Sequence, residues 1–206
     1  AILEEFYRIK IDLGHVPSRV EMFTYMDEDL YYNMKKKSKI NIFKDYTKFL
    51  KDNNKISEKK YELIGTFAHD FIKFIENTSM SKTYKIPVLL AFYNNGEMKL
   101  EIDDEDLYRS FKEFYNKGSN GFDMLKDKST SKFKTWPKKE YVSLARKNPI
   151  HFLCKSSSEF FTIEEGKVCL NNELKKYLDN NIFLKNVKDA IDFRTKEYYK
   201  NRFNNK

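Results

Sequence analysis

The chain has 206 residues, of which 40% are hydrophobic and 16% aromatic, a composition that excludes an intrinsically disordered protein. Its longest apolar run, "IPVLLAFY", is shorter than the roughly 18 residues that span a membrane, so we expect a soluble, cytoplasmic protein with no membrane partner. The formal net charge of +8 permits an anionic partner without requiring one.

The sequence lacks the motifs of several classes of functional site. It opens "AILEEFYRIK", without Met and already with helical periodicity, so we interpret it as part of a longer chain. Cys154, Cys169 and the three histidines lack the spacing of a zinc site. There is also no Walker loop, dinucleotide-binding motif or zinc-protease motif. We therefore expect no metal or cofactor in these residues.

Residues 1–78 are predicted to form a module of short helices. Apolar residues recur at helical spacing from residue 2 to 13, and Gly14 is a plausible stop. Ser18 and Glu21 have the spacing of a capping box, so a second helix is expected there. Two more helices are expected in "DEDLYYNMKKKS" and "INIFKDYTKFLKD", and Ser57 is the expected cap of a longer one through residue 77.

Residues 79–206 are predicted to hold a winged-helix module followed by C-terminal helices. "SKTYKIPVLLAFY" is helix-like, "EMKLEI" alternates as a strand does, and Asp103 with Asp106 can cap the next helix. Pro137 suits the first turn of a third helix, "HFLC" and "FFTI" read as extended, and "FTIEEGKVCL" reads as a hairpin. The predicted order of elements, helix, strand, helix, helix and hairpin, is that of a winged helix. Residues 137–147 are then the predicted recognition helix. "NNELKKYLDN" and the segment from Ile182 to Phe203 supply two last helices, which can pack on either half of the chain. The expected fold class is thus mainly α, with a small antiparallel β element.

Positive charge gathers in "LKDKSTSKFKTWPKKEYVSLARKNP", residues 125–149, which contains the only tryptophan. From residue 117 to 139 there are seven lysines against two aspartates, whereas residues 95–115 have seven acids against three bases. Lysine binds phosphate as a point charge, and aromatic rings among cations can stack on unpaired bases. The candidate nucleic-acid-binding residues are Lys126, Lys128, Lys132, Phe133, Lys134, Trp136, Lys138, Lys139, Arg146 and Lys147. The alternative is that Trp136 anchors a loop whose lysines are merely solvated.

Two enzymatic interpretations remain open. The acidic run "EIDDEDL" could bind a divalent metal, although acids at a helix start also complement the helix dipole. A nuclease could pair Asp103 or Glu97 with Lys99, but such short patterns are common in this composition. His69 and His151 have no nucleophile or metal partner at a useful spacing, so we expect them to be structural or surface residues.

Five phrases together carry a resemblance: "LGHVPSRVEMFTYMD", "SKTYKIPVLLAFYNNGEMKLEI", "SFKEFYNKGSNGFDMLKDKS", "KNPIHFLCKSSSEFF" and "AIDFRTKEYY". They resemble the region that follows the motor domains in bacterial superfamily-2 helicases of the DEAD/DEAH-box, restriction-helicase type. The resemblance implies a parent that hydrolyses ATP with Mg²⁺ and remodels DNA or RNA. No motor motif lies within residues 1–206, so any such activity belongs to another part of the parent.

We therefore expect a non-catalytic accessory fragment that engages nucleic acid, DNA rather than RNA, beside the motor domains of the same chain. The alternative is a protein-interaction module that docks on the motor or on a partner enzyme, and an exposed apolar patch would indicate it. A metal-dependent nuclease is the third interpretation.

Overall fold

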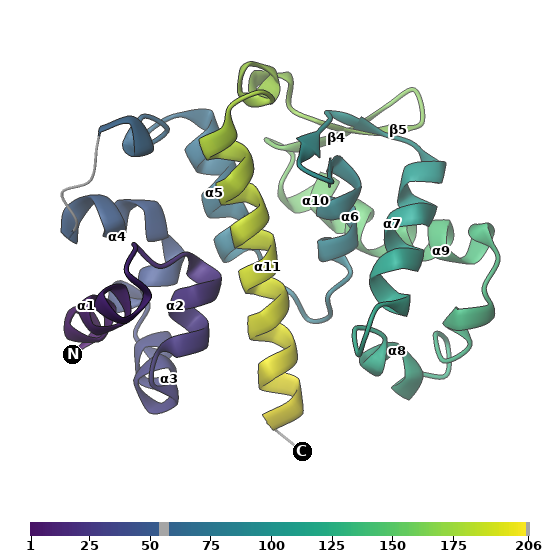
Figure 1. The fold of residues 1–206 in the computed structure, drawn as a ribbon. Helices are drawn as coiled ribbons and strands as arrows, with labels where there is room; N and C mark the ends of the chain where they lie inside the picture. The colour runs from purple at the N-terminus through teal and green to yellow at the C-terminus, as the bar shows by residue number, and fades with distance from the viewer. Residues whose placement is uncertain (54–57, 205–206) are drawn as a thin grey trace. The chain divides into compact units, whose positions relative to one another are not determined.

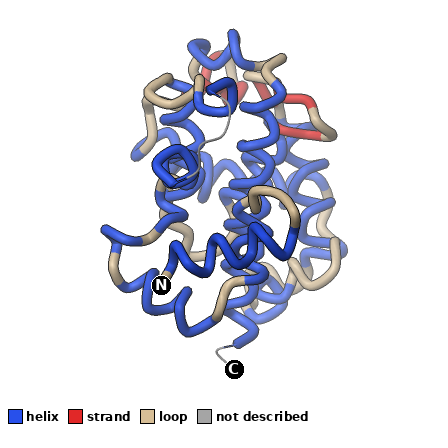
Figure 2. Tube along the Cα trace, turned by 60° about the vertical axis from the view of Figure 1, so that its left-hand side comes forward, coloured by secondary structure: helices blue, strands red, loops and turns tan. Residues whose placement is uncertain are grey.

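The computed structural model describes residues 1–53 and 58–204. It is mainly helical with two small antiparallel sheets, which confirms the predicted fold class (Figures 1 and 2). The chain divides into two compact units. Unit 1 comprises Ala1–Thr78 and Asn181–Lys206, and unit 2 comprises Ser79–Asn180.

Unit 1 contains helices only, within the described residues. They are α1 (Ile2–Leu13), α2 (Arg19–Tyr25), α3 (Glu28–Lys36), α4 (Tyr46–Asn53), α5 (Phe67–Asn77) and α11 (Asn181–Asn204), with the 3₁₀ helices η1 (Ser38–Ile40), η2 (Ile42–Lys44) and η3 (Glu58–Tyr61). The capping box predicted at α2 is present, because the Ser18 hydroxyl accepts from the Glu21 amide and the Glu21 carboxylate accepts from the Ser18 amide, each at 3.1 Å. Gly14 ends α1 in the left-handed conformation, as expected.

The helix predicted to run up to residue 77 is shorter than expected. The α-helix α5 begins after Thr66, whose hydroxyl accepts a hydrogen bond from the His69 amide. Gly65 precedes it with a φ of +83°, a conformation that an α-helix cannot contain. Ser57, the expected cap, lies outside the described residues.

Aromatic rings fill the core of unit 1. Phe43 and Phe193 stack with centroids 4.4 Å apart, and Phe23 meets Phe193 edge to face at 5.6 Å. Phe193 belongs to α11, so these rings join α11 to α2 and η2, and α11 also packs on α5 (Figure 1). The structure assigns α11 to unit 1, which differs from its predicted place in the second module.

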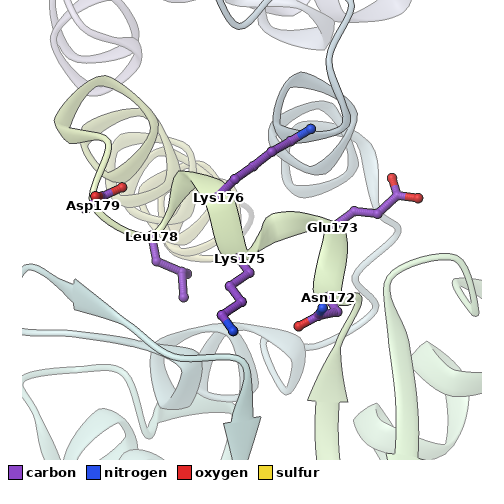
Figure 3. Close-up of a pocket in the computed structure, with 6 residues that line it drawn as sticks. All are labelled: Asn172, Glu173, Lys175, Lys176, Leu178 and Asp179. Carbon is purple, nitrogen blue, oxygen red and sulfur yellow. The ribbon is translucent and has the colours of Figure 1, made fainter.

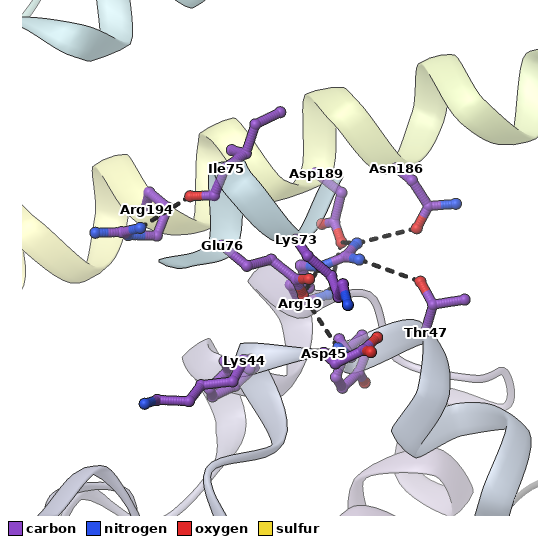
Figure 4. Close-up of polar contacts among 12 residues, drawn as sticks. Arg19, Lys44, Asp45, Thr47, Lys73, Ile75, Glu76, Asn186, Asp189 and Arg194 are labelled. Atoms are coloured by element: carbon purple, nitrogen blue, oxygen red, sulfur yellow. Dashed lines mark hydrogen bonds and ion pairs between the residues drawn. The ribbon is translucent and has the colours of Figure 1, made fainter. Parts of the chain in front are cut away.

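The buried residue Arg19, at the start of α2, links this helix to α5 and α11 by hydrogen bonds (Figure 4). The Arg19 side chain is 1% exposed and donates to Glu76 at 2.9 Å, to Asp189 at 3.0 Å and to Asn186 at 3.0 Å. Its guanidinium also lies 5.5 Å from the ring centroid of Tyr46. Burial alone would lower the pKa of Arg19, but attraction to Glu76 and Asp189 outweighs it and the pKa is raised. The arginine therefore stays charged inside the unit.

Unit 2 mixes helices with two small sheets. Its helices are α6 (Lys85–Phe92), α7 (Asp104–Asn116), α8 (Phe122–Lys126), α9 (Lys138–Ala145), α10 (His151–Ser156), the π-helix η5 (Arg146–Ile150), and the 3₁₀ helices η4 (Phe133–Thr135) and η6 (Asn172–Tyr177). Its strands are β1 (Tyr93–Asn94), β2 (Glu97–Met98), β3 (Glu101–Ile102), β4 (Phe161–Glu164) and β5 (Lys167–Leu170). β1 pairs with β2, and the other sheet has the order β3-β5-β4, antiparallel throughout.

Several local predictions for unit 2 are confirmed and others are corrected. The Asp103–Asp106 capping box opens α7, and β4 and β5 form the expected hairpin, with Glu165 and Gly166 at positive φ in its turn. "EMKLEI" is not one strand but two, β2 and β3. "NNELKKYLDN" forms the 3₁₀ helix η6 and not an α-helix.

The prediction that "HFLC" is extended was wrong. α9, η5 and α10 follow one another without a gap, so residues 138–156 form one continuous helical run. A proline inside an α-helix normally breaks it, because its ring clashes with the preceding turn and it has no amide hydrogen. The wider π turn of η5 contains Pro149 instead of ending there.

Candidate nucleic-acid interface

The predicted basic stretch occupies two consecutive parts of unit 2: the connection from α7 to α9 and the helical run 138–156 (Figure 1). Residues 117–155 hold ten Lys or Arg against three Asp or Glu. The remaining residues of the unit, 79–116 and 156–180, hold eight against twelve. Positive charge is therefore concentrated on one contiguous part of the unit.

The lysines of this stretch are on the surface. Exposed side chains are those of Lys126, Lys128, Lys132, Lys134, Lys138, Lys139 and Lys147. The Lys126 ammonium lies 4.0 Å from the ring centroid of Phe122, a cation–π contact. Within the described residues, no ion pair engages Lys128, Lys132, Lys134, Lys139 or Lys147. These five ammonium groups are available to an anionic partner.

Phe133 cannot have the stacking role predicted for it. Its side chain is 0% exposed, and a Cβ placed on Gly121 would lie only 2.4 Å from its Cζ atom. The carbonyl of Phe133 also accepts a hydrogen bond from the Tyr141 hydroxyl at 2.7 Å. Phe133 thus anchors the basic connection to the core of unit 2, which corrects its assignment as a base-stacking residue.

Trp136 is half-buried and packs edge to face on Tyr141, with centroids 5.3 Å apart. Tyr141 is itself fixed, because its ring is buried and its hydroxyl donates to the carbonyl of Phe133; burial also raises the pKa of Tyr141. Packing on this tyrosine therefore holds Trp136, which is partly exposed in the same stretch of sequence as the lysines.

Lys138 and Arg146 differ from their basic neighbours because each forms an ion pair with an acidic residue. The Lys138 ammonium donates to Glu105 at 2.5 Å. The Arg146 guanidinium donates to Asp104 at 2.7 Å and to the carbonyl of Gly166, in the β4–β5 turn, at 2.7 Å. These two predicted site residues join elements of unit 2 to one another, and their charges are largely compensated.

Two exposed residues of α10, Phe152 and Lys155, are not among the predicted site residues, and the Phe152 side chain is 49% exposed. His151 beside them is on the surface, one of the two positions expected for it. Phe152 and Lys155 were not predicted because the segment was interpreted as a strand. The signal was the four-residue spacing of Lys147, His151 and Lys155, which matches the spacing of the buried residues Tyr141, Ala145, Pro149 and Leu153.

The acidic run does not converge on a metal site. Asp104 and Glu105 hold Arg146 and Lys138, and Asp106 accepts from Lys99 at 2.7 Å. Glu101 faces Lys167 at 3.8 Å. Within the described part of the chain, no group of three His, Cys, Asp or Glu residues is placed to hold a metal ion. Ion pairing across unit 2 accounts for these acids.

His69 has structural partners. The Gly65 amide donates to its Nδ1 atom at 3.2 Å, so the ring proton of a neutral imidazole sits on Nε2 and is donated to Asp45 at 2.9 Å. Burial alone would raise the pKa of Asp45. The hydrogen bond from His69 is the main cause that opposes burial, and the pKa of Asp45 is lowered. His69 therefore links α5 to the residue just before α4.

A hollow of about 630 Å³ lies at η6, lined by Asn172, Glu173, Lys175, Lys176, Leu178 and Asp179. Figure 3 shows that the Lys175 and Lys176 side chains point in different directions and that the Glu173 carboxylate does not meet Lys175. Without polar groups that converge on one point, the hollow lacks the arrangement of a binding site.

Searches of protein-family models, of curated proteins and of solved structures find no match to this chain. No helix within residues 1–53 and 58–204 has the length and apolar character needed to cross a bilayer.

Proposed function

We propose that unit 2 is a winged-helix module that binds nucleic acid through residues 117–155. Its order of elements supports the proposal: helix α6, strand β3, helix α7, the helical run 138–156, then the hairpin β4–β5. The sheet order β3-β5-β4 is also that of a winged helix, in which the last strand lies between the other two. The helical run takes the place of the recognition helix.

The observation that carries the proposal is the separation of charge at exposed residues. Residues 117–155 concentrate the bases, whereas the turn of the hairpin carries Glu164 and Glu165. An acidic turn repels phosphate, so we place the phosphate contacts on the connection before the helix and on the helix itself. Lys128, Lys132, Lys134 and Lys139 are the residues proposed to make them, because no acid in the described residues engages them.

The biological setting rests on the resemblance to helicases. In this proposal the chain is an accessory part of a parent that hydrolyses ATP elsewhere, and it holds DNA near the motor domains. The protein makes no covalent change to the nucleic acid in this role.

Fluorescence anisotropy tests the proposal with labelled single-stranded and duplex DNA and RNA, in salt from about 50 to 200 mM. The variant is Lys132→Glu with Lys134→Glu. The matched control is Lys175→Glu with Lys176→Glu, which changes the charge of the same unit equally at exposed positions of η6. We expect salt-dependent binding that the first pair of changes weakens at least about tenfold and the control leaves nearly unchanged. Equal loss in both variants would show an effect of net charge alone, and no binding at low salt would refute the proposal.

A further inference from the structure

Unit 1 contains a groove that the nucleic-acid proposal does not use. It has a volume of about 780 Å³ and runs between the start of α1, helix α3, the 3₁₀ helices η1 and η2, and α4. This volume lies in the range of ligand-binding pockets. Every residue that lines the groove belongs to the described residues of unit 1.

Apolar and basic side chains both line the groove, and we call the apolar ones its floor and the lysines its rim. Leu3, Leu30, Ile40 and Phe49 contribute apolar surface, and Leu3 and Ile40 are 39% and 47% exposed. Leaving such side chains in water costs free energy that a partner recovers by covering them.

Four exposed lysines line the same groove: Lys37, Lys39, Lys44 and Lys48. Within the described residues, no ion pair engages any of the four. Two aspartates also line the groove, and the carboxylate of Asp45 already accepts from His69 and from the Lys48 amide. The groove therefore presents a net positive field around an apolar floor.

The apolar side chains of the groove distinguish between two classes of anionic partner, a single-stranded nucleic acid and an acidic protein segment. Unpaired bases bind on the open faces of aromatic rings. Phe49 is an aromatic residue of this lining, and its ring already stacks on Tyr46 at 5.9 Å and meets Phe6 edge to face at 5.2 Å. The other apolar residues named above are aliphatic, and aliphatic floors accept leucine-like side chains, as in grooves that bind amphipathic helices.

We propose that this groove binds an acidic amphipathic segment of a partner protein, with its apolar side chains on the floor and its carboxylates near Lys39, Lys44 and Lys48. The charge complementarity places the acids of the partner along the rim and its apolar residues between them. This site lies in unit 1 and is independent of the nucleic-acid function proposed for unit 2.

A labelled synthetic peptide of about four helical turns, with leucines along one face and glutamates elsewhere, is the probe. Anisotropy is measured with the 206-residue chain. We expect micromolar binding that falls at least about tenfold in the variant Lys39→Glu, Lys44→Glu, Lys48→Glu, since three attractive charges are lost and the three new carboxylates repel the peptide. Ile40→Asp, which changes an exposed floor residue, is expected to weaken binding as well.

Four controls make the result specific. Lys59→Glu, Lys185→Glu, Lys196→Glu changes the charge of unit 1 equally at exposed residues outside the groove and should leave binding unchanged. A peptide of the same composition in scrambled order, and one with glutamine in place of glutamate, should both bind more weakly. The variant Lys132→Glu, Lys134→Glu in unit 2 should bind the peptide normally, so the two proposals can fail separately.

The proposal is overturned if the wild-type chain does not bind the peptide, or if the groove variant binds it as the control does. Displacement of the peptide by unlabelled single-stranded DNA, with the same dependence on Lys39, Lys44 and Lys48, would make the groove a nucleic-acid site instead. Self-association in sedimentation that the groove variant abolishes would place a second copy of the chain there, which also overturns it.

Discussion

Arg19 and Asp189 are 170 residues apart in the chain and are joined twice: both the backbone amide and the guanidinium of Arg19 donate to the same carboxylate oxygen, at 2.8 Å and 3.0 Å. The first of these bonds holds the start of α2 and the second holds the arginine side chain. One aspartate of α11 thus fixes both the position of a helix and the placement of a buried charge.

Removal of Arg19 is expected to destabilise unit 1 strongly. Arg19→Ala leaves Glu76 and Asp189 without their shared partner, and breaking a buried ion pair costs about 3–5 kcal/mol. Urea unfolding monitored by circular dichroism measures the loss. Asp192→Asn is the control, because it breaks the exposed pair between Lys188 and Asp192 and should cost less than about 1 kcal/mol. A similar small loss for Arg19→Ala would contradict the role given to this network.

Arg146 is expected to restrain the β4–β5 hairpin. Arg146→Ala removes the hydrogen bond to the Gly166 carbonyl, so the amides of residues 161–170 should exchange faster with solvent deuterium. Lys147→Ala, at the next position, should leave their exchange unchanged. If the two variants exchange alike, the contact does not restrain the hairpin.

Phe152 is expected to stack on bases if nucleic acid lies along the helical run. A stacked base contributes about 1–3 kcal/mol, so Phe152→Ala should weaken single-stranded binding at least about fivefold and duplex binding less. Ile163→Ala, a change at another exposed apolar residue of unit 2, should have no effect on either substrate. An equal loss for single strands and duplex would point to a duplex contact and not to stacking.

Asp106 should make the stability of unit 2 depend on pH. Burial alone raises its pKa, but hydrogen bonds from the Lys99 side chain and the Asp103 amide lower it below its ordinary value of 3.8. A carboxylate with a depressed folded-state pKa stabilises the fold above pH 3.8, and this stabilisation is lost as pH falls through the lower folded pKa.

The comparison of wild type with Asp106→Asn isolates this contribution. We expect the wild type to be more stable at pH 6 and the difference to shrink as pH falls below about 4, measured by urea unfolding at each pH. A difference that stays constant from pH 6 to pH 3 would exclude the ionised carboxylate as its cause.

Local features of the structure could be predicted from the sequence, and long-range ones could not. The capping boxes at Ser18 and Asp103 depend only on residues three positions apart, so their spacing was sufficient evidence. The place of α11 depends on Phe193 meeting Phe23 and Phe43, contacts with residues far away in the sequence that no local pattern encodes.

The candidate interface could also be predicted only as far as local information reaches: its exposed lysines were predicted, and the burial of Phe133 was not. Exposure of the lysines follows from their charge and needs no tertiary information. Burial of Phe133 depends on the closeness of Gly121 and Tyr141, and in a segment without helical or strand periodicity nothing distinguishes an inward phenylalanine from an outward one. Phe152 was not predicted because "HFLC" was interpreted as extended, whereas the π turn continues the helix through it.

The π-helix also absorbs one residue of chain length within the helical run. A π turn uses one residue more than an α turn, so α10 keeps the facing that a regular α-helix one residue shorter would give it. Leu153 therefore stays in the core while Phe152 stays on the surface. A deletion of one residue in α9 has no such compensation: an α-helix turns by about 100° per residue, so every later side chain of the run would rotate by about that angle. The chain can thus change its length at this one turn while the same side chains of α10 face the core.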